Sequence, residues 1–129
     1  MKEKRNSMGT TLQVESAVRS RYSEAAKMKY LDSLGNLGVL YLVSNETDLG
    51  EDKHAREQKA VNLFRQGAEQ GNAWCLLQYA RCLESGTGVD RDLTAATSWY
   101  RRAALAGSRP AQDWCREHHI NVTAEEQQR

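Results

Sequence analysis

The sequence is poor in the residues that break helices and close turns. It has one proline, one phenylalanine and nine glycines among 129 residues. A strand-rich sandwich needs turn residues about every 8 to 12 positions, and this chain offers too few of them. Alanine, leucine, glutamine, glutamate and arginine, which favour helices, recur throughout. We therefore expect an all-α chain, and its length suits one domain.

Long apolar runs are also missing. The longest, residues 37–43, is far shorter than the run of about 18 residues that indicates a membrane span. The basic residues 1–5 are followed by the polar residues 6–11, where a signal peptide would have an apolar stretch. The sequence thus predicts neither a membrane span nor secretion through a signal peptide.

Cysteine is scarce and odd in number, with Cys75, Cys82 and Cys115 only. Cys75 and Cys82 fall on one predicted helix, where their spacing places them roughly 10 Å apart along the axis, too far for a disulfide. Reduced thiols fit this pattern, and we expect a cytoplasmic protein.

No charge of one sign dominates, since 18 Lys and Arg stand against 17 Asp and Glu. The chain as a whole therefore lacks the basic footprint of a nucleic-acid-binding protein. Charge is uneven along the sequence, because residues 1–29 hold seven basic and three acidic side chains, whereas residues 30–70 hold four and seven.

What the sequence does contain is internal repetition, the signature of a stacked repeat protein. Small and aromatic landmarks recur 36 positions apart, pairing Ala60 with Ala96, Phe64 with Tyr100, Ala68 with Ala104 and Gly71 with Gly107. An offset of 42 leads back to a degenerate third copy with Val18, Tyr22, Ala25 and Ala26. The intervening segments repeat too, so that Leu37, Gly38 and Tyr41 align with Tyr79, Ala80 and Leu83, and one position is shared by Ser33, Cys75 and Ala111.

Within each copy the apolar residues recur at helical spacing. We expect six helices, near 12–28, 30–43, 56–70, 73–84, 92–106 and 109–119. Gly71 and Gly107 follow two of these patterns, where a left-handed glycine ends a helix, and Asp92 is placed to cap the fifth. Residues 85–88 form a glycine-rich turn, and residues 1–9 and 121–129 are expected to be flexible.

The block from Cys75 to Ala111 resembles a Sel-one-like repeat, a relative of the tetratricopeptide repeat. The resemblance rests on the turn Ser85-Gly-Thr-Gly88-Val89, on Asp92, and on the pattern Ala96-x-x-Trp99-Tyr100-x-x-Ala103-Ala104-x-x-Gly107. It implies a right-handed α-solenoid of antiparallel helix pairs over residues 10–120. Its parts are a half-repeat 10–29, repeats 30–71 and 72–107, and a half-repeat 108–120.

Catalytic and metal-binding patterns are weak. Cys115 precedes His118 and His119 at a spacing that places ligands on one helix face, but a structural zinc needs four ligands and further partners are lacking. No phosphate-binding loop or nucleophile motif is present. We expect no enzyme activity, no metal and no cofactor.

The resemblance implies a non-enzymatic adaptor, assembly factor or inhibitor in a bacterial cytoplasm, with a protein or peptide on the concave face. Two alternatives stay open. One is a neutralising partner of a toxin. The other is a small nucleic-acid-associated regulator that uses the basic N-terminal helix, with basic residues near aromatic ones. The basic residues are Arg19, Arg21, Lys27, Lys29, Arg101 and Arg102.

The predicted partner surface collects residues on the first helix of each repeat that the core does not use. Tryptophan and arginine, which are enriched at interface hot spots, are among them. The candidates are Asp32, Asn36, Trp74, Gln78, Arg81 and Trp114. The opposing interpretation is that the two tryptophans only fill the stack or cover its end. Self-association through the solenoid ends is a further expectation.

Overall fold

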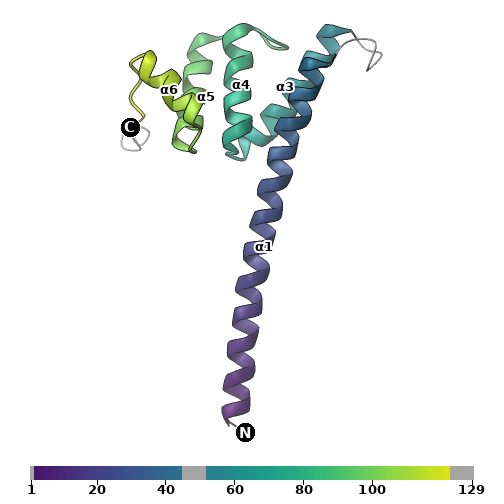
Figure 1. Ribbon diagram of the computed structural model, residues 1–129, viewed down its shortest axis with the longest axis vertical. Coiled ribbons are helices and arrows are strands. Elements are labelled where there is room, and N and C mark those ends of the chain that lie inside the picture. The colour runs from purple at the N-terminus through teal and green to yellow at the C-terminus, as the bar shows by residue number, and fades with distance from the viewer. Residues whose placement is uncertain (1, 45–51, 123–129) are drawn as a thin grey trace. The chain divides into compact units, whose positions relative to one another are not determined.

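The computed structural model describes the backbone of residues 2–44 and 52–122, and their side chains from residue 16 onward except residue 22. This part of the chain is helical and contains no strand. The helices are α1 (Lys2–Val43), α3 (Lys53–Glu69), α4 (Ala73–Ser85), α5 (Leu93–Leu105) and α6 (Arg109–Glu117) (Figure 1). None of these helices combines the length and the apolar character that crossing a bilayer requires.

The chain divides into two compact units, residues 1–30 and residues 31–129. The first is formed by the N-terminal part of α1, whose described side chains between residues 16 and 30 are all exposed. The second holds the rest of α1 together with α3, α4, α5 and α6, and it contains the buried residues.

Short polar side chains begin the four helices of the second unit that follow α1. Each accepts a hydrogen bond from the backbone N–H three residues on, which satisfies a donor that the helix itself leaves free. The capping residues are Asp52, Asn72, Asp92 and Ser108. The predicted cap at Asp92 is confirmed, and the glycine-rich turn predicted at residues 85–88 lies at residues 86–89, because α4 includes Ser85. Gly71 and Gly107 have φ of +83° and +102°, as expected for glycines that end helices.

The prediction of six helices is wrong, because the expected helices 12–28 and 30–43 are parts of one helix, α1. The other junctions between copies read Gly71-Asn72 and Gly107-Ser108, which supply a left-handed residue and then an N-cap. The equivalent junction of the first copy reads Lys29-Tyr30. Neither residue favours ending or starting a helix, so the helix continues through it.

The boundaries of α3, α4, α5 and α6 lie within three residues of the prediction, whereas α1 begins at Lys2, ten residues before the predicted start at residue 12. Among these four helices the largest shift is at α3, which begins at Lys53 because Asp52 caps it. Residues 2–9, expected to be flexible, carry helical backbone at the start of α1. Of the expected C-terminal tail, residues 123–129 lie outside the described part, and the half-repeat boundaries stay predictions.

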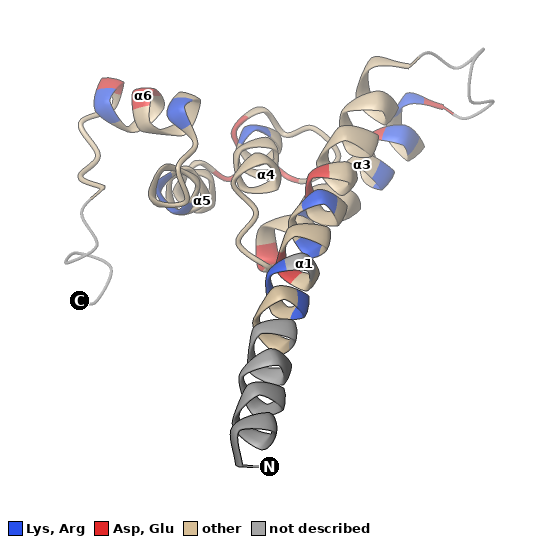
Figure 2. Cartoon of the chain, turned by 60° about the horizontal axis from the view of Figure 1, so that its bottom comes forward, with Lys and Arg blue, Asp and Glu red and all other residues tan. Residues whose placement is uncertain are grey.

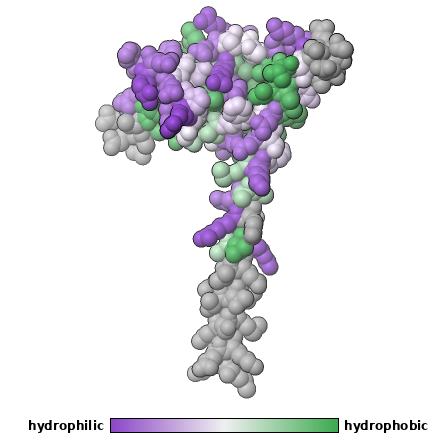
Figure 3. Space-filling model, viewed as in Figure 1, coloured by the Kyte–Doolittle hydropathy of each residue, from purple (hydrophilic) through white to green (hydrophobic). Residues whose placement is uncertain are grey.

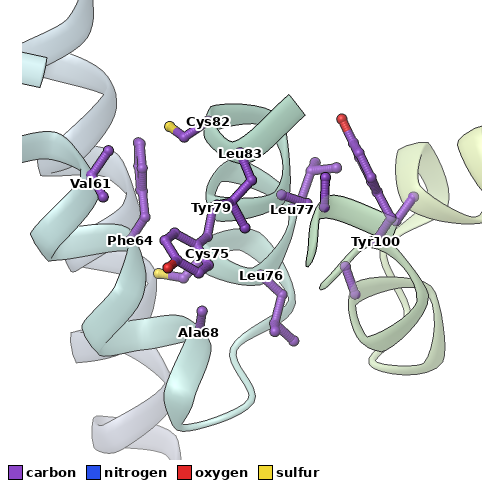
Figure 4. Packing of buried hydrophobic residues seen from close by; sticks show 14 of the residues in the cluster. Val61, Phe64, Ala68, Cys75, Leu76, Leu77, Tyr79, Cys82, Leu83 and Tyr100 are labelled. Carbon is purple, nitrogen blue, oxygen red and sulfur yellow. The ribbon is translucent and has the colours of Figure 1, made fainter. Parts of the chain in front are cut away.

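The core follows the repeat equivalences. Ala60 and Ala96 are fully buried, and Phe64 and Tyr100 are buried at the next equivalent position. Helix α4 lies between α3 and α5 and contributes to both sides. Figure 4 shows the sulfur atoms of Cys75 and Cys82 directed toward α3, while Leu77 lies on the side of Tyr100. The core is thus a row of neighbouring helix contacts.

Glycines permit the closest of these approaches. A Cβ atom added to Gly38 would lie 2.5 Å from Cε1 of Phe64, so the small residue predicted there is required by packing. At Gly67, an added Cβ would collide with Cys75. The Cys75 thiol donates to the carbonyl of Leu31 at 3.3 Å, and these contacts bring α1, α3 and α4 together.

Candidate functional site

Glu84, near the end of α4, joins three helices. Its Oε1 accepts a hydrogen bond from the Tyr100 hydroxyl at 2.8 Å, and its Oε2 accepts one from Nε1 of Trp114 at 2.9 Å. The Trp114 ring stacks on Tyr100 on one side and on His118 on the other, each with a centroid distance of 4.0 Å. The indole of Trp114 therefore has a fixed position.

The pKa of the Tyr100 hydroxyl reflects this arrangement. Burial, and then the hydrogen bond and charge of Glu84, raise the pKa of Tyr100 well above its usual range. Arg81 lies near enough to the hydroxyl to oppose this shift. The tyrosine hydroxyl thus stays a hydrogen-bond donor at neutral pH.

Beside this cluster lies an open groove of about 450 Å³, formed by the end of α4, the start of α5 and the end of α6. Leu93, Trp114 and Ile120 give it an apolar surface, and Leu93 is an exposed hydrophobic residue. Polar groups surround this surface, among them Glu84, Arg91, Thr97 and His118. An apolar lining with a few oriented polar groups is the usual character of a ligand-binding site.

The structure divides the predicted partner residues into two groups. Arg81 and Trp114 meet at the Glu84–Tyr100 cluster. Asp32 lies elsewhere, where its carboxylate accepts a hydrogen bond from Asn72 at 2.8 Å. Trp74 packs against Gly35, which lies on the same helix as Asp32.

The two remaining candidates differ in exposure. Asn36 is exposed, and Gln78 is buried. The position of Trp74 against Gly35 agrees with the interpretation that this tryptophan fills the stack. Its indole nitrogen is buried without a hydrogen-bond partner in the described part of the chain.

Sequence reasoning missed Glu84, Leu93 and Ile120 as groove residues. Repeat comparison could not find Glu84, because its equivalents are Leu42 and Ile120, which are not acidic. Ile120 lies beyond α6, where its N–H donates to the carbonyl of Cys115 at 2.8 Å. Only the fold brings it next to Leu93.

The basic residues considered for nucleic acid have different surroundings. Arg19, Arg21 and Lys27 are exposed on α1, where basic residues are spread along the helix (Figure 2). Arg102 lies 4.4 Å from the centroid of Trp99, and Arg101 donates to the carbonyl of Asn121 at 2.8 Å. The pair on α5 is therefore engaged within the fold.

The candidate metal ligands near the C-terminus do not form a cluster. Cys115 is buried, and burial raises the pKa of its thiol. His118 and His119 are exposed, and Nδ1 of His118 lies 2.8 Å from the carbonyl oxygen of Trp114. Within the described residues there is no group of three His, Cys, Asp or Glu side chains suited to a metal ion.

A second surface lies at the other end of the second unit. Leu37, Leu40 and Val43 expose large apolar side chains on the last turns of α1, and Figure 3 shows the resulting green patch. A shallow groove of about 210 Å³ runs beside it, lined by Leu37, Tyr41, Lys59, Asn62, Leu63 and Gln66. We call the residues that line this groove, together with Leu40 and Val43, the open end.

Comparison with known proteins gives one family and two curated relatives. The chain is 32% identical over 94 residues to DAP3-binding cell death enhancer 1 from Rattus norvegicus, and 29% identical over 94 residues to the protein of that name from Mus musculus. Each match covers 73% of this chain and 17% of the relative. Both relatives are mammalian, and the bacterial cytoplasmic setting stays a prediction.

No solved structure shows a significant match to the chain. The family model that describes the Sel1 repeat matches residues 32–72 and 75–108, which together exceed half of the chain. These matches contain the helix pairs, the buried repeat landmarks and Glu84, so the chain belongs to the Sel1 repeat family.

Proposed function

We propose that this chain is a non-enzymatic protein-binding module, and that the groove beside Trp114 receives a segment of its partner. Sel1 repeats support a role in protein–protein interaction. The observation that carries the location is the fixed indole of Trp114, which stacks between Tyr100 and His118 and lines the groove. A rigid aromatic residue in a pocket is the typical hot spot of an interface.

The groove suits an apolar side chain from the partner. Leu93 and Ile120 offer contact area beside the indole, and covering them would remove apolar surface from water. Glu84 and Arg91 place opposite charges at the same groove, which favours a segment that has polar groups beside its apolar residue. The groove therefore fits an amphipathic or extended peptide segment.

The names of the two relatives state that they bind DAP3. The part of them that this chain matches is a small fraction of their length. DAP3 is accordingly the first partner to test, and a regulator that binds one protein through its repeats is the role we propose.

The surroundings of the thiols support a non-enzymatic role. Burial raises the pKa of Cys75 and that of Cys82 to about 11, so both thiols are protonated at neutral pH. Cys115 is also buried with a raised pKa. The thiolate is the reactive form of cysteine, so these three residues are poor nucleophiles.

The experiment is binding of purified DAP3, and of a displayed peptide library, to the full chain and to Leu93→Glu. We expect selected peptides to share one large apolar residue and to bind Leu93→Glu at least about tenfold more weakly, since burying leucine contributes roughly 1.5–3 kcal/mol. Leu105→Glu is the matched control, because Leu105 is also exposed on α5 and does not line the groove.

Equal weakening by the two leucine variants would show that α5 was damaged and would remove support for the groove. Peptides that bind wild type and Leu93→Glu alike would contradict this location. If DAP3 fails to bind while selected peptides compete for the groove, the site stands and DAP3 is not the partner.

A further inference from the structure

The open end exposes apolar side chains whose repeat equivalents are buried. In the second repeat, Tyr79 and Cys82 are 9% and 3% exposed, and they lie where α3 packs against α4. Their equivalents in α1, Leu37 and Leu40, are 43% and 58% exposed. The difference indicates a surface built to receive a preceding helix.

The same chain carries an unmatched copy of that helix. Residues 16–28 correspond to the part of α3 that includes Ala60 and Ala68, which are fully buried. Their equivalents, Val18 and Ala26, are exposed. Residues 16–28 therefore have the sequence of a packed helix and exposed side chains, and the open end has exposed apolar side chains at positions that are buried in the second repeat.

Residues 16–28 and the facing segment of α1 have side chains of complementary size. In the second repeat, Gly67 meets Cys75 so closely that no Cβ fits at Gly67. The equivalent residues of the first copy are Ala25 and Ser33, so a larger residue on one helix is matched by a smaller one on the other. The third copy places Ala103 and Ala111 at these positions, and both are fully buried. Small residues are thus retained on both sides of this helix contact.

Folding of residues 16–28 back onto the open end of the same chain would require a turn near residue 29. The two turns of this type contain Gly71-Asn72 and Gly107-Ser108. Lys29-Tyr30 has neither a left-handed glycine nor a capping side chain, and α1 is helical through it. A second copy of the chain can supply the segment without any turn.

We propose that two copies exchange these segments, so that residues 16–28 of each copy pack against the open end of the other. If the repeat equivalents of Gly67 and Cys75 make the same contact between two copies, Ala25 of one copy lies opposite Ser33 of the other copy. Seven residues away on each antiparallel helix, Val18 of one copy then lies opposite Leu40 of the other copy. Both copies make the same contacts, as a two-fold symmetric dimer requires.

The first test measures the mass of the full chain in solution by light scattering over a range of concentrations. Wild type is a dimer, and Leu40→Glu raises the dissociation constant roughly a hundredfold, because each dimer contains the change twice. Leu40 is exposed in the single chain, so the variant keeps its helix content. Leu105→Glu, an exposed leucine outside both surfaces, leaves the dimer intact.

The second test identifies the packed segment by disulfide cross-linking under mild oxidation. A mixture of Val18→Cys and Leu40→Cys chains forms a cross-linked heterodimer, which the same mixture with Met28→Cys in place of Val18→Cys does not form. The native cysteines are all buried, so the background is low.

A chain that is monomeric at all concentrations overturns the proposal, as does a dimer that Leu40→Glu does not weaken. The double variant Val18→Cys/Leu40→Cys separates exchange from fold-back. Cross-linked dimers support exchange, and an internally bridged monomer overturns it in favour of fold-back. None of these outcomes depends on the groove beside Trp114.

Discussion

The ring of Phe64 occupies the space that a side chain at position 38 would need, with its Cε1 atom 2.5 Å from the Cβ position of Gly38. Phe64 is fully buried, and Gly38 is buried on the facing segment of α1. The contact sets how closely α1 and α3 approach in the second unit. It also explains why a helical segment retains glycine despite its cost to helix stability.

Gly38→Ala should destabilise the fold by about 1–3 kcal/mol, since overpacking forces a buried ring to move. Urea unfolding followed by circular dichroism measures the change. Gly38→Ala should cost less stability in a Phe64→Leu background than in wild type, because leucine leaves more room for the added Cβ. Additive effects of the two changes would contradict direct contact between these residues.

Removal of the Glu84 carboxylate should leave two donors without their acceptor. We expect Glu84→Ala to lower the free energy of unfolding by about 2 kcal/mol, because the partly buried N–H of Trp114 and the buried hydroxyl of Tyr100 lose hydrogen bonds. Glu117→Ala, which removes an exposed carboxylate from α6, is the matched control. Equal stability of the two variants would show that the bridge contributes little.

Stability should fall at alkaline pH. Thiols ionise near pH 9 in an unfolded chain, whereas Cys75 and Cys82 have a pKa of about 11 in the fold. Between these values the folded chain binds more protons than the unfolded chain, so the free energy of unfolding decreases as pH rises. The stabilisation is complete below about pH 9 and is lost toward pH 11.

Urea unfolding at a series of pH values tests this expectation, and the variant Cys75→Ala/Cys82→Ala should have a shallower slope between pH 9 and 11 than wild type. The raised pKa of Tyr100 adds a loss of the same sign at higher pH. An unchanged slope in the double variant would exclude the two thiols as its cause.

A turn installed at the start of the second unit should convert the exchanged dimer into a monomer. Lys29→Gly/Tyr30→Asn gives the first copy the junction residues of the second, and it allows residues 16–28 to reach the open end of their own chain. Light scattering measures the mass. Lys29→Ala/Tyr30→Ala, which removes the same two side chains without supplying a left-handed glycine or a capping residue, should remain a dimer.

A dimer of unchanged affinity in Lys29→Gly/Tyr30→Asn would contradict the role of this junction in exchange. Loss of the dimer to the same extent in both double variants would instead show that removing the Lys29 and Tyr30 side chains accounts for the effect.

Sequence predicted the helix pairs well because each repeat marks its own boundaries. The starts of α4, α5 and α6 are marked by the short polar caps Asn72, Asp92 and Ser108. Gly71 and Gly107 end the helices that precede α4 and α6. The break expected near residue 29 rested on repeat spacing alone. The local residues Lys29 and Tyr30 contradicted it, and the local signal was correct.

The candidate site was less accessible to sequence reasoning. Arg81 and Trp114 were identified by residue type and repeat position, and the fold does bring them to one cluster. Glu84 belongs to no repeated position, and Ile120 reaches the groove only through the turn after α6. Such contacts depend on three-dimensional packing between helices that no periodic pattern records.

Glu84 also bears on how the repeats unfold. Stacked repeats can lose their terminal elements in separate steps when neighbouring interfaces are weak. Here a single carboxylate on α4 holds one side chain of α5 and one of α6. Detachment of α6 would expose Glu84, the hydrogen-bond acceptor of Tyr100, to water. The last helix and the interior of the stack are therefore coupled and should unfold in one cooperative transition.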